Sequence, residues 1–311
     1  MKKILCIDGG GIRGLIPALV LSSIEDNTQK RIASMFDLIA GTSSGGMIAL
    51  GLSVPGDDGI PAYSAKDIAK IYKKMGHEIF RNTFWRSMIS MFGLAEVKYR
   101  YQPLEETLKK FLGETELGSS VTKLLVSSYD IENQRTFFFK SWNEKHKSVK
   151  MRDIARATTA APSYFEPAQV SINGKVHTLI DGGVFANNPA LSAYSEAKRL
   201  FPEEEMLIVS LGAGKHSSPI SYVESRNWGI VEWAVPLFNI VFDSVSDSVD
   251  YYLRYIMGEY YFRFQTVVDV KHKHIDKVPR TDEEIESLKD EARKMLRDRK
   301  EDLDKVCSLL I

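Results

Sequence analysis

The chain has 311 residues, and at roughly 150 residues per domain this length gives a prior of about two domains. It carries 41 Lys+Arg and 41 Asp+Glu, so the formal net charge is zero, which argues against a nucleic-acid partner. The hydrophobic content of 44% is ordinary for a globular protein and argues against intrinsic disorder. Two cysteines, Cys6 and Cys307, are too few for a disulfide framework or a cysteine-built zinc site and favour a reducing compartment.

The N-terminus lacks the features of a secretory signal. Only four apolar residues follow Lys2-Lys3, whereas a signal peptide needs about 7–15. The longest uncharged stretch, residues 38–56, has the length of a membrane span but contains a Gly/Ser-rich run and ends at Pro55-Gly56. We therefore expect a cytoplasmic protein, at most peripheral to a membrane.

The first predicted elements alternate between strand and helix. Residues 4–7 and 36–40 are short apolar runs that predict buried strands, and residues 15–24 and 46–52 have helical spacing. Strands and helices joined by almost no loop predict a parallel sheet covered by helices.

The rest of the chain also alternates between predicted helices and strands. They are helices from Ser64, over 103–112 and over 151–159; strands at 124–127 and 136–139, read as a hairpin; strands at 176–180 and 207–211; an aromatic region 228–264, helical at first; and a charged helix from Asp282 to about Lys305. The predicted fold is α/β, with a mostly parallel central sheet flanked by helices and a helical C-terminal extension.

A glycine loop, Asp8–Gly14, follows the first strand and opens the first helix. Gly9, Gly11 and Gly14 satisfy G-x-G-x-x-G, so a nucleotide or phosphate site is one interpretation. A dinucleotide site needs an acid at the end of the second strand, and Asp37 stands at its start. The same backbone N–H groups could instead hold an oxyanion, with Arg13 either orienting an anionic substrate or forming a structural ion pair.

Gly41–Gly45 matches G-x-S-x-G between a strand and a helix, which is the context of a nucleophile elbow carrying Ser43. A serine nucleophile needs a base. A Ser43–Asp181–His216 triad is conceivable, but only one obvious strand precedes the elbow, which is atypical of the fold that carries such triads.

Asp181 ends the predicted strand 176–180 and precedes Gly182-Gly183. Active sites of α/β proteins form at such strand ends. A carboxyl with an ordinary pKa near 4 is a weak base, and a dry pocket would raise that pKa. Asp181 could thus accept the Ser43 proton directly, although a turn aspartate is the simpler interpretation of this residue alone.

Taken in order, three motifs resemble the patatin-like phospholipase family. They are the D-G-G-G-x-R-G loop at Asp8–Gly14, the G-x-S-x-G elbow at Gly41–Gly45 and the D-G-G box at Asp181–Gly183. The stretches 157–165 and 186–189 are also similar to that family, so the resemblance spans about residues 4–214. The remainder of the chain resembles nothing recognised.

The resemblance implies a three-layer catalytic domain at 1–214, with residues 215–311 as an extension packed on it. It implies a Ser43–Asp181 dyad without histidine that cleaves fatty-acyl esters of phospholipids or related lipids through an acyl-enzyme. The oxyanion hole would be the backbone of Gly9, Gly10 and Gly11. Supporting residues would be Arg13, Gly41, Gly45, Gly182 and Gly183. No cofactor, metal or calcium is implied.

Three further segments concern the lipid. The apolar stretch 84–94 has the composition of a lid or interface element, or of a core helix. Residues 228–264 could line an acyl channel, or form core or an oligomer contact. The basic run 271–274 could meet headgroups, or be a solvated loop. We expect peripheral membrane contact; homo-oligomerisation and an activator stay open.

Overall fold

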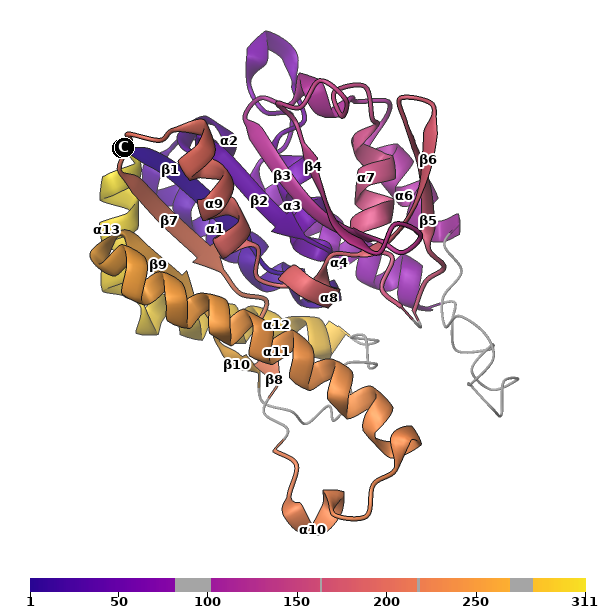
Figure 1. The fold of residues 1–311 in the computed structure, drawn as a ribbon. Helices are drawn as coiled ribbons and strands as arrows, with labels where there is room; N and C mark the ends of the chain where they lie inside the picture. Colours follow the sequence, from indigo (N-terminus) through magenta and orange to yellow (C-terminus); the bar gives the residue numbers. More distant parts are fainter. Residues whose placement is uncertain (82–101, 163, 217–218, 269–281) are drawn as a thin grey trace.

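The computed structural model describes residues 1–81, 102–162, 164–216, 219–268 and 282–311 (Figure 1). Its core is one mixed sheet with the strand order β5-β6-β3-β2-β1-β7-β9, and β4 pairs with β3 off this path. The strands of this sheet are β1 (Lys2–Ile7), β2 (Leu38–Thr42), β3 (Lys123–Asp130), β4 (Arg135–Lys140), β5 (Ala168–Ile172), β6 (Lys175–Asp181), β7 (Met206–Leu211) and β9 (Tyr261–Phe264). A separate parallel pair joins β8 (Lys215–His216) to β10 (Val267–Val268).

Five neighbouring strands run in the same direction, because β3, β2, β1, β7 and β9 pair in parallel. At the other side of the sheet, β6 runs antiparallel to β3 and begins beyond the carboxyl end of β2. Asp181, its last residue, pairs with Ser128, while the preceding Ser127 pairs with Thr42. Asp181 therefore lies at the carboxyl edge of the parallel strands, although β6 runs toward this edge in the opposite direction. A parallel β6 would also have ended at this edge.

Helices cover both faces of the sheet (Figure 1). They are α1 (Leu15–Thr28), α2 (Ile32–Met35), α3 (Ser44–Leu52), α4 (Ala65–Arg81), α6 (Gln102–Leu112), α7 (Met151–Thr158), α8 (Gly183–Ala186), α9 (Ala190–Leu200), α10 (Tyr222–Ser225), α11 (Ile230–Met257), α12 (Asp282–Asp298) and α13 (Lys300–Leu310), with short 3₁₀ turns, among them one over Gly11–Gly14.

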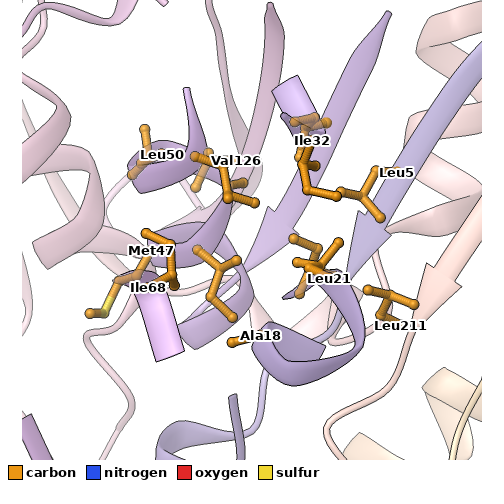
Figure 2. Close-up of a cluster of buried hydrophobic side chains, with 14 of the residues drawn as sticks. Leu5, Ala18, Leu21, Ile32, Met47, Leu50, Ile68, Val126 and Leu211 are labelled. Carbon is orange, nitrogen blue, oxygen red and sulfur yellow. The ribbon is translucent and has the colours of Figure 1, made fainter. Parts of the chain in front are cut away.

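The buried side chains divide between the two faces because successive residues of a strand point to opposite sides. Leu5 and Ile7 belong to the larger cluster, which includes residues of α1, α3, α4, α7 and α12. Figure 2 shows part of it, with Leu5 and Leu211 from the sheet near Leu21 of α1. Ile4 and Cys6 belong to the smaller cluster, formed with α9 and α11. The result is a helix–sheet–helix arrangement, and the predicted α/β class is confirmed.

Individual elements also match the sequence patterns, with several differences, among them β5 and α9, which the patterns did not predict. The predicted hairpin is confirmed as antiparallel β3 and β4, with Val126 opposite Phe139. The charged C-terminal helix is two helices, because Arg299 leaves the helical region at φ −115° and ψ 29°. No glycine or proline marks this break in the sequence.

The C-terminal third is not only helical. After α11 ends at Gly258, which has φ 53°, the four residues of β9 add an outer parallel strand to β7. Helix α12 then packs on α1. Strand β9 was not predicted, since four residues are too few for a periodic pattern. Among the helices described, none is long and apolar enough to cross a bilayer.

Candidate active site

Ser43 stands on a sharp turn between β2 and α3. Its backbone has φ 54° and ψ −124°, a conformation that residues other than glycine rarely adopt. The flanking glycines are needed because the chain folds closely on itself: a Cβ on Gly41 would collide with the Gly45 carbonyl oxygen, and one on Gly45 with that of Ile7. The turn thus presents Ser43 at the start of α3, as the elbow motif predicts.

Hydrogen bonds from other elements hold this elbow. The Ser43 N–H donates to Thr158 Oγ1 at 2.9 Å, and the Thr158 hydroxyl donates to the Ser127 carbonyl at 2.7 Å. The Thr42 hydroxyl lies 2.6 Å from the Ala186 carbonyl oxygen and also 2.6 Å from Ser127 Oγ. These bonds give a structural role to the segments 157–165 and 186–189, whose individual roles the sequence did not reveal.

Asp181 lies next to the elbow with a buried carboxyl group that is 3% exposed. Its Oδ1 accepts the Gly183 N–H at 2.7 Å, and its own N–H donates to the Ala160 carbonyl at 3.0 Å. Burial raises the pKa of Asp181 to about 7, although the Ser43 hydroxyl and the Gly183 N–H both act to lower it. The carboxyl group is therefore poised to exchange a proton near neutral pH.

Both glycines after Asp181 are required by close contacts. A Cβ on Gly182 would collide with Ser127, and one on Gly183 with the ring of Phe242 from α11. Helix α11 therefore lies against the backbone that carries Asp181.

The glycine loop lies against Ser43, since a Cβ on Gly9 would lie 3.1 Å from the Ser43 Cβ. The Gly9 N–H donates to the Asn187 carbonyl at 3.0 Å, and the Gly10 N–H to Ser44 Oγ at 3.0 Å. Gly11 has φ 58°, and open space surrounds the position of its missing Cβ. Within the part of the chain that the structure describes, the Gly11 N–H has no acceptor.

Arg13 ties the far end of this loop to the rest of the fold. Its Nη1 donates to the Gly214 carbonyl at 2.7 Å and its Nε to the Gly10 carbonyl at 3.4 Å. Burial lowers the pKa of Arg13, opposed by Asp243 of α11. These contacts give Arg13 a structural role in holding the loop.

Several other candidates from the sequence have side chains that the structure does not describe. His216 lies in β8, which pairs with β10 apart from the main sheet, and its side chain is outside the described residues, as are the segments 84–94 and 271–274. In the described ranges no group of three His, Cys, Asp or Glu side chains could hold a metal ion.

The central sheet, the serine elbow and the adjoining glycine loop define the class of α/β proteins that present a serine at the carboxyl edge of their parallel strands. Within this class the chain belongs to the patatin-like phospholipase family, whose model matches residues 5–194. The resemblance in the motifs is thereby confirmed.

Curated relatives support the same assignment. Patatin-like protein 4 of Arabidopsis thaliana is 33% identical over 286 residues, covering 81% of this chain and 71% of the relative. Patatin-like protein 2 of the same plant is 34% identical, with the same two coverages. Probable inactive patatin-3-Kuras 1 of Solanum tuberosum is 35% identical over 81% of this chain and 74% of its own length. Among solved structures, VipD from Legionella pneumophila is 12% identical with a TM-score of 0.43, covering 96% of this chain and 67% of that one.

Family membership supports a lipid acyl hydrolase in general terms. Because one relative is named as probable inactive, an activity for this chain has to rest on its own site residues. The family match also ends at residue 194, so β7, α11 and β9 lie beyond it.

Proposed function

We propose that this chain is a serine acyl hydrolase that cleaves fatty-acyl esters of phospholipids or related lipids with a Ser43–Asp181 dyad. The observation that carries the proposal is the buried Asp181 carboxyl, whose pKa burial raises to about 7 and which interacts with the hydroxyl of a serine on a strained elbow. A base works best when its pKa lies near the operating pH, and Asp181 meets that condition without a histidine.

The chemistry follows from these two side chains. The Ser43 oxygen attacks the ester carbonyl carbon while Asp181 takes its proton, which gives a tetrahedral oxyanion. Collapse of this intermediate breaks the ester bond, and Asp181 returns the proton to the leaving alcohol. Water then attacks the acyl-enzyme while Asp181 accepts its proton. Asp181 returns this proton to the Ser43 oxygen as the acyl–oxygen bond breaks and the fatty acid leaves.

We assign the oxyanion hydrogen bond to the Gly11 N–H. The Gly9 and Gly10 N–H groups already bond to Asn187 and Ser44, so their role is to hold the loop beside Ser43. The N-terminus of α3, directly after Ser43, adds the positive end of a helix dipole. Losing one oxyanion donor typically costs about 3–4 kcal/mol of barrier.

This distribution of donors also weighs against the first of the two alternatives. A phosphate site at Gly9–Gly14 would need several free N–H groups pointing to one place, and two of the three glycines are already bonded. In a triad with His216, replacing His216 would lower kcat as much as replacing Asp181.

The test is a panel of phospholipids and neutral lipid esters, with products identified by mass spectrometry. We expect Ser43→Ala and Asp181→Asn each to lower kcat by at least about 10⁴-fold, as removal of a nucleophile or its base does. His216→Ala should leave kcat unchanged. Full activity in Ser43→Ala would refute the proposal, and a loss in His216→Ala equal to that in Asp181→Asn would establish the triad instead.

We further propose that the enzyme contacts its lipid surface through α10 and the N-terminal half of α11, called the apolar arm (residues 222–241). The arm projects from the body of the molecule (Figure 1). Its exposed apolar residues are Tyr222, Val223, Ile230, Val231, Leu237, Ile240 and Val241. Its charged residues are Glu224, Arg226 and Glu232. An apolar surface with one cation suits a zwitterionic lipid better than an anionic one.

The position of the apolar arm fits this role, because Phe242, the next residue of α11, packs against Gly183 beside Asp181. We expect the double variant Ile230→Asp, Val231→Asp to lose binding to phosphatidylcholine vesicles while hydrolysing a soluble short-chain ester at the wild-type rate. Tyr255→Asp, at the exposed far end of α11, is the control and should bind vesicles normally. Unchanged vesicle binding in the double variant would refute the contact, and a dimer that dissociates in this variant would make the arm an oligomer interface.

A further inference from the structure

A buried ion pair joins the start of the glycine loop to the outermost strand of the sheet. Asp8 follows β1 and is 2% exposed, and Arg263 in β9 is 3% exposed. The guanidinium meets the carboxylate with two parallel hydrogen bonds, from Nη1 to Oδ1 at 2.9 Å and from Nη2 to Oδ2 at 2.5 Å. Nη1 also donates to Ser210 Oγ at 2.9 Å. Such a bidentate pair fixes the orientation of the carboxylate as well as its position.

The register of three neighbouring strands produces this contact. Cys6 of β1 pairs with Ser210 of β7, and Ser210 pairs with Arg263 of β9. Asp8 lies two residues beyond Cys6, so its side chain points to the same face of the sheet. This face is the one covered by α11, where Asp250 and, from β8, Lys215 also act on the Asp8 carboxyl.

The geometry is that of an ion pair, because each carboxylate oxygen faces one guanidinium nitrogen. Burial raises the pKa of Asp8, and the guanidinium opposes that rise. Burial disfavours the guanidinium ion, but the Asp8 carboxylate raises the pKa of Arg263 above its ordinary value. A buried ion pair adds little stability compared with apolar side chains of the same size, and breaking it leaves an uncompensated charge. Its main effect here is therefore to fix the orientation of the Asp8 side chain.

Asp8 is also the last residue with a side chain before Gly9–Gly11. Three successive glycines have wide backbone freedom, so the position of the loop depends on the contacts at its two ends as well as on the Gly9 and Gly10 hydrogen bonds. At one end Asp8 is fixed twice, by Arg263 through its carboxylate and by its own N–H, which donates to the Leu211 carbonyl at 2.9 Å. At the other end Arg13 bonds to Gly214.

We propose that Arg263 is a positioning residue for the reaction: through Asp8 it holds the glycine loop where the Gly11 N–H meets the oxyanion formed on Ser43. The proposal rests on the function proposed above and extends the active site into the C-terminal third, beyond the residues 5–194 that the family model matches. Arg263 touches neither substrate nor reacting atoms, and acts only by orienting Asp8.

The test compares Arg263→Lys with wild type. Lysine keeps the charge but cannot form the two parallel hydrogen bonds. On a soluble short-chain ester we expect kcat to fall about ten- to a hundredfold with KM changed less than about twofold, because the lost interaction belongs to the transition state. Affinity for an alkyl trifluoromethyl ketone, which forms a tetrahedral adduct with a serine, should fall by the same factor as kcat.

A matched control breaks an ion pair away from the loop. Lys140 Nζ lies 2.7 Å from Glu196 Oε1, and both side chains are mostly buried. Glu196→Gln should leave kcat and ketone affinity at wild-type values. If Arg263→Lys does not fold, Ser210→Ala removes only one hydrogen bond to the guanidinium and should lower kcat about two- to fivefold.

Amide hydrogen exchange tests the same inference without catalysis. In Arg263→Lys, or in Ser210→Ala, exchange should accelerate in peptides covering residues 8–14 and stay unchanged in β3 and β4. A folded Arg263→Lys with wild-type kcat, or with wild-type exchange at residues 8–14, would overturn the inference. If wild type hydrolyses no ester, the proposed function fails, and the exchange result alone then decides whether Arg263 positions the loop.

Discussion

The serine elbow and the glycine loop lie against each other but are held in different ways. The elbow is constrained by close backbone contacts, of Gly41 with Gly45 inside the turn and of Gly45 with Ile7 of the neighbouring strand. Hydrogen bonds to Thr158 and Ala186 add to these contacts. The loop depends on partners spread through the chain: Ser44, Asn187, Gly214 and Arg263, the last 255 residues from Asp8. The nucleophile is therefore fixed mainly by close backbone packing, whereas the groups that would receive the developing charge are held by hydrogen bonds to partners spread along the chain.

The largest effect is expected at Asp181, the carboxyl group beside the elbow. Its folded pKa lies above the ordinary carboxyl value, so its contribution to stability is full below about pH 4 and is lost as the pH rises through about 7. Asp181→Asn should raise the free energy of unfolding near pH 8 by up to about 4 kcal/mol and leave it unchanged near pH 4. Urea unfolding at the two pH values measures this.

Activity should follow the opposite trend over the same range. The base acts only when deprotonated, so kcat of wild type should rise with pH through about 7. An activity that is flat between about pH 5 and 8, or an Asp181→Asn variant less stable than wild type near pH 8, would contradict the assigned protonation of this carboxyl.

The elbow can be broken by a single methyl group. A Cβ on Gly45 would collide with the Ile7 carbonyl oxygen and lie 2.6 Å from that of Asp8. Because both obstacles are backbone atoms, we expect Gly45→Ala to lower the free energy of unfolding by about 3 kcal/mol or more. Gly229→Ala is the control, since its φ of −92° suits any residue and only the Glu232 carboxylate is near, at 3.2 Å. Equal stability of the two variants would disprove the crowding.

Thr158 tests the hydrogen bonds that supplement this crowding. Thr158→Val leaves the Ser43 N–H and the Ser127 carbonyl without their partner, which should cost about 2 kcal/mol and lower kcat on a soluble ester. Among the described residues, the hydroxyl of the neighbouring Thr159 donates to carbonyls of its own helix, so Thr159→Val should cost less and keep kcat. The denaturation midpoint and kcat are measured for both variants. If Thr158→Val and Thr159→Val do not differ in either quantity, the elbow needs no support from α7.

The smallest effect is expected where α11 supports the loop. Asn187 Nδ2 donates to Ser246 Oγ at 3.2 Å, and the Asn187 carbonyl accepts the Gly9 N–H. Ser246→Ala should cost about 1 kcal/mol and change kcat less than about threefold. A larger loss of kcat than in Arg263→Lys would mean that α11, and not β9, is the main support of the loop.

The shortness of the motifs explains what the sequence could predict. Asp8–Gly14, Gly41–Gly45 and Asp181–Gly183 are short motifs whose residue types are dictated by turns and close contacts, so Ser43 and Asp181 could be named as candidates without a structure. The α/β class followed from the alternating strands and helices. The antiparallel approach of β6 could not be predicted, because strand direction leaves no mark in a seven-residue pattern.

Arg263 lay beyond prediction for a different physical reason. Arg263 meets Asp8 only because three strands from opposite ends of the chain pair in one sheet. A single arginine in a four-residue strand carries no local pattern that would indicate this contact. The apolar arm was recognised only as an aromatic region, because composition does not tell exposed apolar residues from buried ones.

The central claim, that Ser43 is a nucleophile beside a base and an oxyanion donor, is tested most directly by covalent labelling. Wild type and Ser43→Ala would be treated with an alkyl fluorophosphonate, which phosphonylates activated serines, and the intact mass and fragment spectra recorded. We predict one adduct per chain, located on Ser43, and none in Ser43→Ala. An unlabelled wild type that still hydrolyses lipid esters, or an adduct that persists in Ser43→Ala, would contradict the account.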